Sequence, residues 1–194
     1  MNKFIIAPNP QVVNKYLEKW DSLDNYVMQE KSLMKLFQKT YPCNNDIDDV
    51  LIKVCALNDF YSTNIFSPFS VAIHIVSIDI DNRMSNNDLR LVNDIAKVNI
   101  KGIQKNFYSF ATKYCSHHYP KIFPIYDSYV EKMLLYFKNA DHFMVFSKID
   151  LKIYENYVEI LKVFQKYYCL TEFNLKQIDK YLWQAGKEYF KKEY

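Results

Sequence analysis

Apolar residues recur at intervals of three and four along most of the chain, which is the spacing of one face of an α-helix. Asn9-Pro10 and Ser67-Pro68 each place a capping side chain before a proline, an arrangement that favours a helix start. Asp46 is expected to cap another helix. The predicted helices of the first part run from Pro10 to about Trp20, over the apolar positions from Leu23 to Phe37, from Val50 to Leu57, and from Phe69 to Ser77.

A polar turn is expected from Asp79 to Asn87, and helical spacing resumes after it. Pro120 and Pro124 prevent any preceding helix from continuing through them, and Asp127 or Ser128 is expected to cap the next one. The pattern predicts about nine helices in all and no strand. The later helices are a short one over Leu89 to Ala96 that ends near Gly102, one from about Gln104 to His118, one with Val130, Leu134 and Phe137 inward, and two long ones carrying Ile153, Tyr157, Ile160, Leu161 and Phe164, then Leu175, Ile178, Leu182 and Trp183.

Glycine is almost absent, since Gly102 and Gly186 are the only two glycines in the sequence. Tight β-hairpins need residues that adopt positive φ, so this scarcity favours helices joined by polar turns. No Gly/Ser/Pro-rich linker, low-complexity tract or fixed-period repeat divides the chain. We therefore expect an all-α fold in which residues 1–194 form a single globular domain.

The net charge of +3 is too small to commit the whole protein to nucleic acid or to an anionic membrane, but it is unevenly distributed. Residues 101–140 carry +4, and residues 41–100 carry −4. The cysteines form no Cys-x-x-Cys pair, and Cys55 lies in an apolar pattern where a buried free thiol is expected. The N-terminal apolar run is too short for a signal peptide or a membrane span. A reduced cytoplasmic protein without membrane attachment is expected.

Several enzyme classes are disfavoured because their short motifs are missing. The sequence has no Walker loop, no Gly-x-Gly-x-x-Gly fingerprint, no Gly-x-Ser-x-Gly elbow and no kinase motifs. His117 and His118 are adjacent, so they point in different directions on a helix, and no further ligand lies at metal-binding spacing. No metal ion or other cofactor is predicted. Phosphate contact beside Lys113 and Lys121 is the favoured role for either histidine.

The strongest concentration of polar and aromatic residues runs from Lys113 to Tyr129. Lys113 lies on a predicted helix, and Asp127 begins the next helix after a segment stiffened by two prolines. A helix N-terminus orients a carboxylate, and partly desolvated aromatic surroundings can bring a lysine toward nucleophilic competence. The structural alternative makes Asp127 an ordinary N-cap and Lys113 a solvated helix residue with its stem on aromatic rings.

A second polar stretch, from Asn58 to Asn64, follows an apolar helix and precedes Ser67-Pro68. Its side chains are expected either to bond their own backbone in a turn or to face a ligand, and the sequence favours neither.

The order of helix, Lys113, loop, Pro124-Ile125-Tyr126-Asp127 and helix resembles the helix-hairpin-helix DNA glycosylase superfamily, particularly its 8-oxoguanine DNA glycosylase-like branch. The stretch from Val50 to Asp59 is similar to the family's helix that ends in polar residues facing DNA. The resemblance implies a base-excising enzyme of DNA repair. In such an enzyme, Asp127 would stabilise the developing positive charge on the sugar, and Lys113 would attack C1′ or contact a phosphate.

The same resemblance implies that DNA is the partner and leaves two lysines open for the catalytic role. The family's Gly-x-Gly hairpin has at most a remnant here, in Lys101 to Lys105, which makes Lys105 the alternative to Lys113. An iron–sulfur cluster is not expected, because the cysteines lack its clustered spacing. The residues expected to contact DNA or the flipped base are Asn58, Lys105, Tyr114, His117, His118, Lys121, Tyr126 and Tyr129, with Phe107 and Tyr108 as further aromatic candidates.

Two other hypotheses remain open. One is a helical module that keeps the fold without the chemistry and binds a nucleic acid or a protein through the same Tyr, Lys and His side chains. The other is a homo-oligomeric structural protein joined through its aromatic C-terminal helices.

Overall fold

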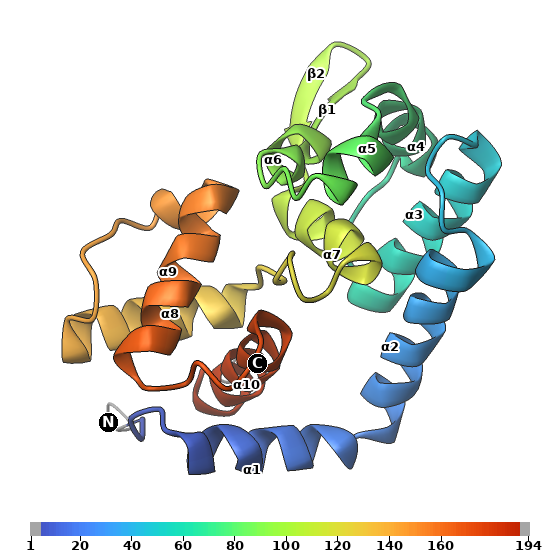
Figure 1. Ribbon diagram of the computed structural model, residues 1–194. Coiled ribbons are helices and arrows are strands. Elements are labelled where there is room, and N and C mark those ends of the chain that lie inside the picture. Colours follow the sequence, from blue (N-terminus) through green and yellow to red (C-terminus); the bar gives the residue numbers. More distant parts are fainter. Residues whose placement is uncertain (1–4, 191–194) are drawn as a thin grey trace. The chain divides into compact units, whose positions relative to one another are not determined.

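Helices dominate the computed structural model, which describes residues 5–190 (Figure 1). This described part contains ten α-helices, a π-helical turn, a 3-10 turn and two short strands. The all-α prediction is therefore confirmed, with one small addition of β structure. No helix among residues 5–190 is long and apolar enough to cross a membrane.

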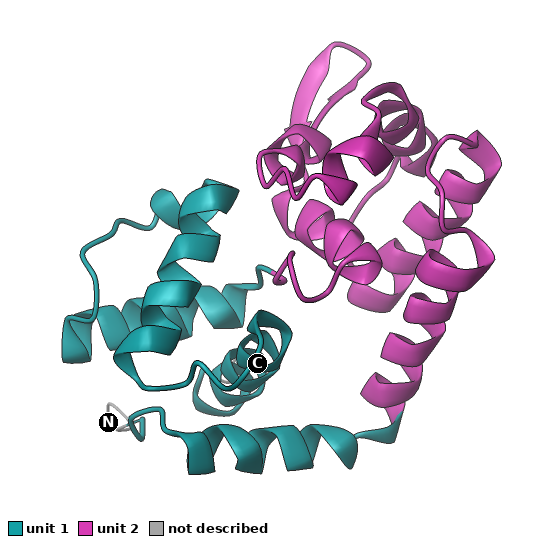
Figure 2. Ribbon diagram, in the orientation of Figure 1, with its two compact units in different colours: residues 1–24, 126–194 teal, residues 25–125 magenta. Residues whose placement is uncertain are grey.

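The chain forms two compact units, which are coloured separately in Figure 2. Unit 1 combines residues 1–24 with residues 126–194, and unit 2 is the continuous segment 25–125. The two ends of the sequence therefore belong to the same unit, and unit 2 is an insertion between them. The expectation of a single domain over residues 1–194 stays a prediction.

Unit 1 is organised around its last helix, α10 (Leu175–Tyr189). Three helices contact α10: α1 (Pro10–Asp21), α8 (Ser128–Asp141) and α9 (Tyr154–Tyr167), the last preceded by the 3-10 turn η2 (Asp150–Lys152). Because it has neighbours on several sides, α10 buries polar as well as apolar positions, including Asp179 and Gln184. Its start is fixed by a capping box between Asn174 and Gln177.

Helices α8 and α10 approach each other closely at Gly186 of α10. A Cβ atom at this position would lie 2.8 Å from both Cβ and the carbonyl oxygen of Tyr129 on α8. Since neither atom belongs to the end of a flexible side chain, α8 and α10 reach this spacing because residue 186 has no side chain.

Unit 2 is built around α7 (Tyr108–His118), which is buried along most of its length. The helices α3, α6 and the π-helical turn η1 all contact α7, and α3 also packs against α4. The remaining elements of the unit, in chain order, are α2 (Asp24–Lys35, whose first residue falls in unit 1), η1 (Leu36–Thr40), α3 (Ile47–Tyr61), α4 (Pro68–Ser77), α5 (Ile80–Ser85), α6 (Leu91–Ala96), β1 (Lys97–Ile100) and β2 (Ile103–Asn106).

A two-stranded ribbon, formed by β1 and β2, replaces the predicted start of a helix at Gln104. The strands pair antiparallel with Ile100 opposite Ile103, so Lys101 and Gly102 form a two-residue turn. Their φ angles are 50° and 81°, and positive values at both positions are what a type I′ hairpin turn requires. The prediction of no strand was wrong because Gly102 closes a hairpin instead of ending a helix.

The predicted helix starts agree with the structure better than the predicted turns do. The side chains of Asn9, Asp46 and Asp127 each accept a backbone N–H at the start of a helix, as expected. Ser67 does not cap α4, because its hydroxyl bonds that of Ser70 instead. The polar turn predicted from Asp79 to Asn87 contains α5, whose Ile80 and Met84 are both only 1% exposed.

The expectation that Cys55 is buried was wrong. The buried face of α3 carries Val50, Lys53, Val54 and Leu57, which leaves Cys55 exposed. Within residues 5–190 every cysteine is a free thiol.

We predict that Gly186→Ala lowers the free energy of unfolding by about 1–3 kcal/mol, because the added methyl group overpacks the contact with Tyr129. Urea denaturation of the wild type and the variant measures the difference. At an open helical site the same change would raise stability by roughly 1 kcal/mol, so a stabilised variant would contradict the packing described for α8 and α10.

Candidate functional site

The densest polar cluster of unit 2 surrounds Asn44, in the loop between η1 and α3. Its side-chain oxygen Oδ1 accepts from Lys53 Nζ at 2.6 Å and from the Tyr114 hydroxyl at 2.5 Å, and lies 3.2 Å from His118 Nε2. Its side-chain and backbone nitrogens donate to the two carboxylate oxygens of Asp81, at 2.5 and 2.7 Å. We call these five residues the Asn44 cluster. It joins α3, α5 and α7 through one amide.

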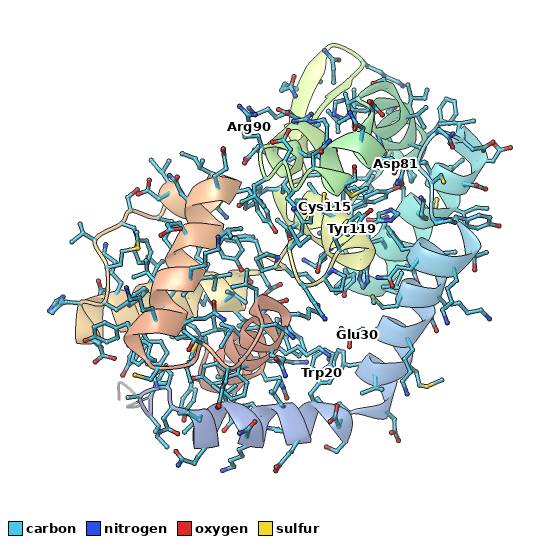
Figure 3. The ribbon with its side chains drawn as sticks, in the orientation of Figure 1. Trp20, Glu30, Asp81, Arg90, Cys115 and Tyr119 are labelled. Atoms are coloured by element: carbon cyan, nitrogen blue, oxygen red, sulfur yellow. The ribbon has the colours of Figure 1, made fainter. Side chains whose placement is uncertain are left out.

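Lys53 is fully buried at the centre of this cluster. Besides Asn44, its ammonium donates to the backbone carbonyls of Tyr41 and Cys43, at 3.0 and 2.7 Å. Burial lowers the pKa of Lys53 to about 8, although the negative charges of Asp81 and Asp49 work in the opposite direction. Asp81, labelled in Figure 3, reaches Lys53 only through Asn44, so the amide links the carboxylate to the buried cation.

The other two members of the cluster are held in their neutral forms. Burial and the neighbouring charge of Lys53 lower the pKa of His118 to about 3. Burial raises the pKa of Tyr114 well above its ordinary value, and its side chain is 0% exposed. At neutral pH, therefore, His118 is an imidazole and Tyr114 a phenol. Their arrangement suits hydrogen bonding within the fold, and neither is placed as an exposed phosphate ligand.

Lys113 and His117 lie on a different side of α7 and meet α3. Lys113 is 4% exposed, and its Nζ donates to the hydroxyl of Ser109 at 2.5 Å. The same ammonium lies 5.2 Å from the ring centroid of Tyr61, within the range of a cation–π interaction. The hydroxyl of Tyr61 is 3.1 Å from His117 Nε2. Lys113 thus sits in a largely desolvated aromatic setting and is not a solvated helix residue.

The remaining candidates of unit 2 are spread over its surface. Asn58 lies in the last turn of α3 and holds the following loop in place, since its Oδ1 accepts from Thr63 Oγ1 and Ile65 N at 2.8 and 2.9 Å. This is the turn-forming role that the sequence left open. Lys105 is exposed on β2, and Lys121 is exposed in the turn after α7. The two alternative lysines therefore differ sharply, because Lys113 is buried and Lys105 is not.

Tyr126, Asp127 and Tyr129 belong to unit 1. Asp127 is the N-cap of α8, and its Oδ1 accepts from Tyr129 N at 2.8 Å. The ring of Tyr129 lies under the ammonium of Lys132, 5.6 Å from its centroid. The predicted pair is therefore divided between the units, with Lys113 in unit 2 and Asp127 in unit 1.

A compact ionic network surrounds Tyr126 within unit 1. Its hydroxyl donates to Glu131 and accepts from Lys152. Glu131 also pairs with Lys148 at 2.9 Å and with Lys152 at 3.2 Å. Burial works to raise the pKa of Glu131, but these bonds and charges outweigh it and lower the pKa instead. A nearly buried carboxylate is thereby kept ionised beside the residue that precedes Asp127.

Sequence reasoning missed Asn44, Lys53 and Asp81, and it included Tyr61 only as part of the stretch from Asn58 to Asn64. For Lys53 one signal was available. Lys53 is three residues after Val50 and four before Leu57, so it falls on the buried stripe of its own helix. A lysine at such a position requires buried oxygen partners. Those partners are supplied by the loop that precedes α3, whose path over Lys53 is not revealed by periodicity.

Within the part of the chain that the structure describes, no three His, Cys, Asp or Glu side chains gather closely enough to hold a metal ion.

The fold and the Asn44 cluster define a mostly helical protein with a buried lysine at the heart of its continuous unit. Residues 12–122 match a family model named HI_0787_N and described as an N-terminal domain. A Haemophilus influenzae protein, named only as an uncharacterized protein, is 51% identical over 147 residues, which cover 75% of this chain and 70% of that relative. The chain therefore belongs to the HI_0787_N family. No solved structure matches it.

We predict that the wild type gains stability relative to a Lys53→Met variant as pH rises from 8 toward 10. In the folded state Lys53 loses its proton near pH 8, whereas in the unfolded state it keeps the proton until about pH 10.5. Between these values the unfolded state binds more protons, so folding becomes more favourable with pH, by at most about 1.4 kcal/mol per pH unit.

Urea titrations of both proteins at several pH values measure this difference, because titrations common to the two chains cancel. A difference in unfolding free energy that stays constant over this range would show that Lys53 titrates as an ordinary exposed lysine.

Proposed function

We propose that this protein binds damaged duplex DNA and acts on it as a DNA glycosylase-like enzyme, with Lys113 as its functional lysine. The observation that carries the proposal is the setting of Lys113, a 4% exposed ammonium held against the Ser109 hydroxyl and the face of Tyr61. Aromatic, water-poor surroundings of this kind favour nucleophilic attack by a lysine amine.

The order of elements adds support. A hairpin turn at Lys101-Gly102 precedes α7, Lys113 follows on that helix, and Asp127 then caps α8 with a half-buried carboxylate. The order of helix, lysine, loop and helix-capping aspartate is the one on which the resemblance to the helix-hairpin-helix glycosylases rests. The exposed position of Lys105 on β2 favours Lys113 over Lys105 as the nucleophile.

In the proposed reaction the Lys113 ammonium gives a proton to the departing base, and the resulting amine attacks C1′ of the damaged nucleotide as the glycosidic bond breaks. The departing base keeps the bonding electron pair, and the amine nitrogen supplies the pair that forms the new bond to C1′. Opening of the sugar ring and loss of a proton from nitrogen then give a Schiff base between Lys113 and C1′.

A binding module without chemistry is the second candidate, and specific contacts favour it. Lys113 already donates to Ser109, Asp127 already caps α8, and the hydroxyl of Tyr114 is used by Asn44. Each of these groups therefore has a structural role that accounts for its position without catalysis.

Borohydride trapping distinguishes the two candidates. The wild type is incubated with duplexes containing 8-oxoguanine, uracil or an alkylated base, and borohydride reduces any Schiff base to a stable amine. We expect a covalent protein–DNA adduct that Lys113→Gln abolishes and Lys105→Gln retains.

Binding to these duplexes without cleavage or adduct would support the binding module and exclude the enzyme. An adduct that is lost in Lys105→Gln but kept in Lys113→Gln would identify Lys105 as the nucleophile in place of Lys113.

A further inference from the structure

The ribbon of β1 and β2 has two unlike faces. Residues opposite each other in an antiparallel pair lie on the same face, and faces alternate along each strand. The pairs Lys97–Asn106 and Asn99–Gln104 therefore share one face, and these four residues are all exposed. We call them the polar face. Val98, on the other face, is 1% exposed, and β1 contacts α4 and α6.

The ribbon projects from unit 2 beyond its helices (Figure 1). Its second strand is exposed at every position, as are both turn residues. The side chain of Asn99 is fixed on the polar face, because its Oδ1 accepts from Gly102 N at 2.8 Å. A short element with an exposed, amide-rich face is thus available to a partner.

Positive charge dominates this element. Residues 97–106 include Lys97, Lys101 and Lys105, all exposed, and no acidic residue. The acidic side chains on the segment that leads into the ribbon are paired: Asp94 lies 2.7 Å and Asp88 lies 2.9 Å from Arg83. Arg90, with a 73% exposed side chain, also pairs with Asp88 at 3.3 Å, so the two arginines balance the two aspartates and the ribbon lysines supply the net positive charge of this segment (Figure 3).

We propose that the ribbon is a DNA-contacting element that enters the major groove of a duplex with its polar face against the base edges. The major groove admits a two-stranded β-ribbon, and asparagine and glutamine side chains bond the exposed donors and acceptors of bases there. The three lysines neutralise flanking phosphates. The choice of DNA rests on the proposed function, but the contact itself does not require any chemistry at Lys113.

Fluorescence anisotropy with a labelled DNA duplex of about 20 base pairs, over roughly 50 to 200 mM salt, tests the contact. We expect the full chain with Lys97→Gln, Lys101→Gln and Lys105→Gln to bind roughly 10- to 100-fold more weakly at the lowest salt. The slope of log affinity against log salt concentration is expected to fall by about 2 to 3, one step for each lost phosphate contact.

The matched control replaces Lys31, Lys35 and Lys39 by glutamine. These lysines are exposed on α2 and η1 of the same unit, and their removal changes the net charge equally. We expect the control to bind within about threefold of the wild type. Equal losses in both variants would mean that net charge alone drives binding, and would overturn the proposal.

Two further measurements separate groove contact from general attraction. Gln104→Ala with Asn106→Ala is expected to weaken binding severalfold while leaving the salt slope unchanged, because neither residue contacts phosphate. An RNA duplex is expected to bind poorly, since its major groove is too narrow for side chains to read. Equal affinity for duplex RNA would overturn the assignment to the major groove.

The outcomes also separate this inference from the proposed function. The triple ribbon variant could instead keep full affinity for DNA and associate with itself. The lysines would then serve to protect the strand edges from pairing, and this inference would fail while the proposed function stands. If ribbon variants lose binding while the wild type yields no trapped adduct, the inference holds and the glycosylase chemistry fails. A wild type that binds no duplex at low salt would overturn both.

Discussion

Burial of the Lys53 ammonium is the constraint around which unit 2 is built. A charged group inside a protein is tolerated only when oxygens surround it and a counter-charge lies within reach. Asn44 supplies one oxygen, the loop before α3 supplies two carbonyls, and Asp81 supplies the counter-charge through the Asn44 amide. The oxygens come from the loop just before α3 and the counter-charge from α5, so the ion is stable only once that loop and both helices have assembled.

The Asn44 cluster also determines which polar residues of α7 are left for other roles. Its Tyr114 and His118 are committed to Asn44, whereas Lys113 and His117 lie by Tyr61 on another side of the helix. One helix thus carries a structural set of polar groups and, separately, the lysine to which we assign chemistry. A rigid buried helix also holds that lysine in a defined position, which catalysis by a positioned amine requires.

Local signals predicted the helices well because capping and helical spacing depend on neighbouring residues. Asn9, Asp46 and Asp127 act as expected, and the buried stripe of α3 follows its apolar positions. The ribbon and the Asn44 cluster were missed for a different reason. A hairpin with a single glycine leaves little local trace, and the partners of Lys53 are chosen by packing between elements. The same limit applies to Lys113, whose aromatic surroundings include a residue of another helix.

Because unit 1 is built from two separate segments of the chain, it cannot fold completely until both segments have been synthesised. Val13 and Tyr16 of α1 are buried, α1 packs on α10, and the backbone carbonyl of Tyr16 is bonded by Gln184. During synthesis α1 emerges from the ribosome before unit 2, whereas α10, which covers it, emerges after unit 2. Unit 2, being continuous, can fold in the meantime. The family match to residues 12–122 includes most of α1 but ends before α10, so a fragment cut at those limits would carry an apolar helix face without its natural cover.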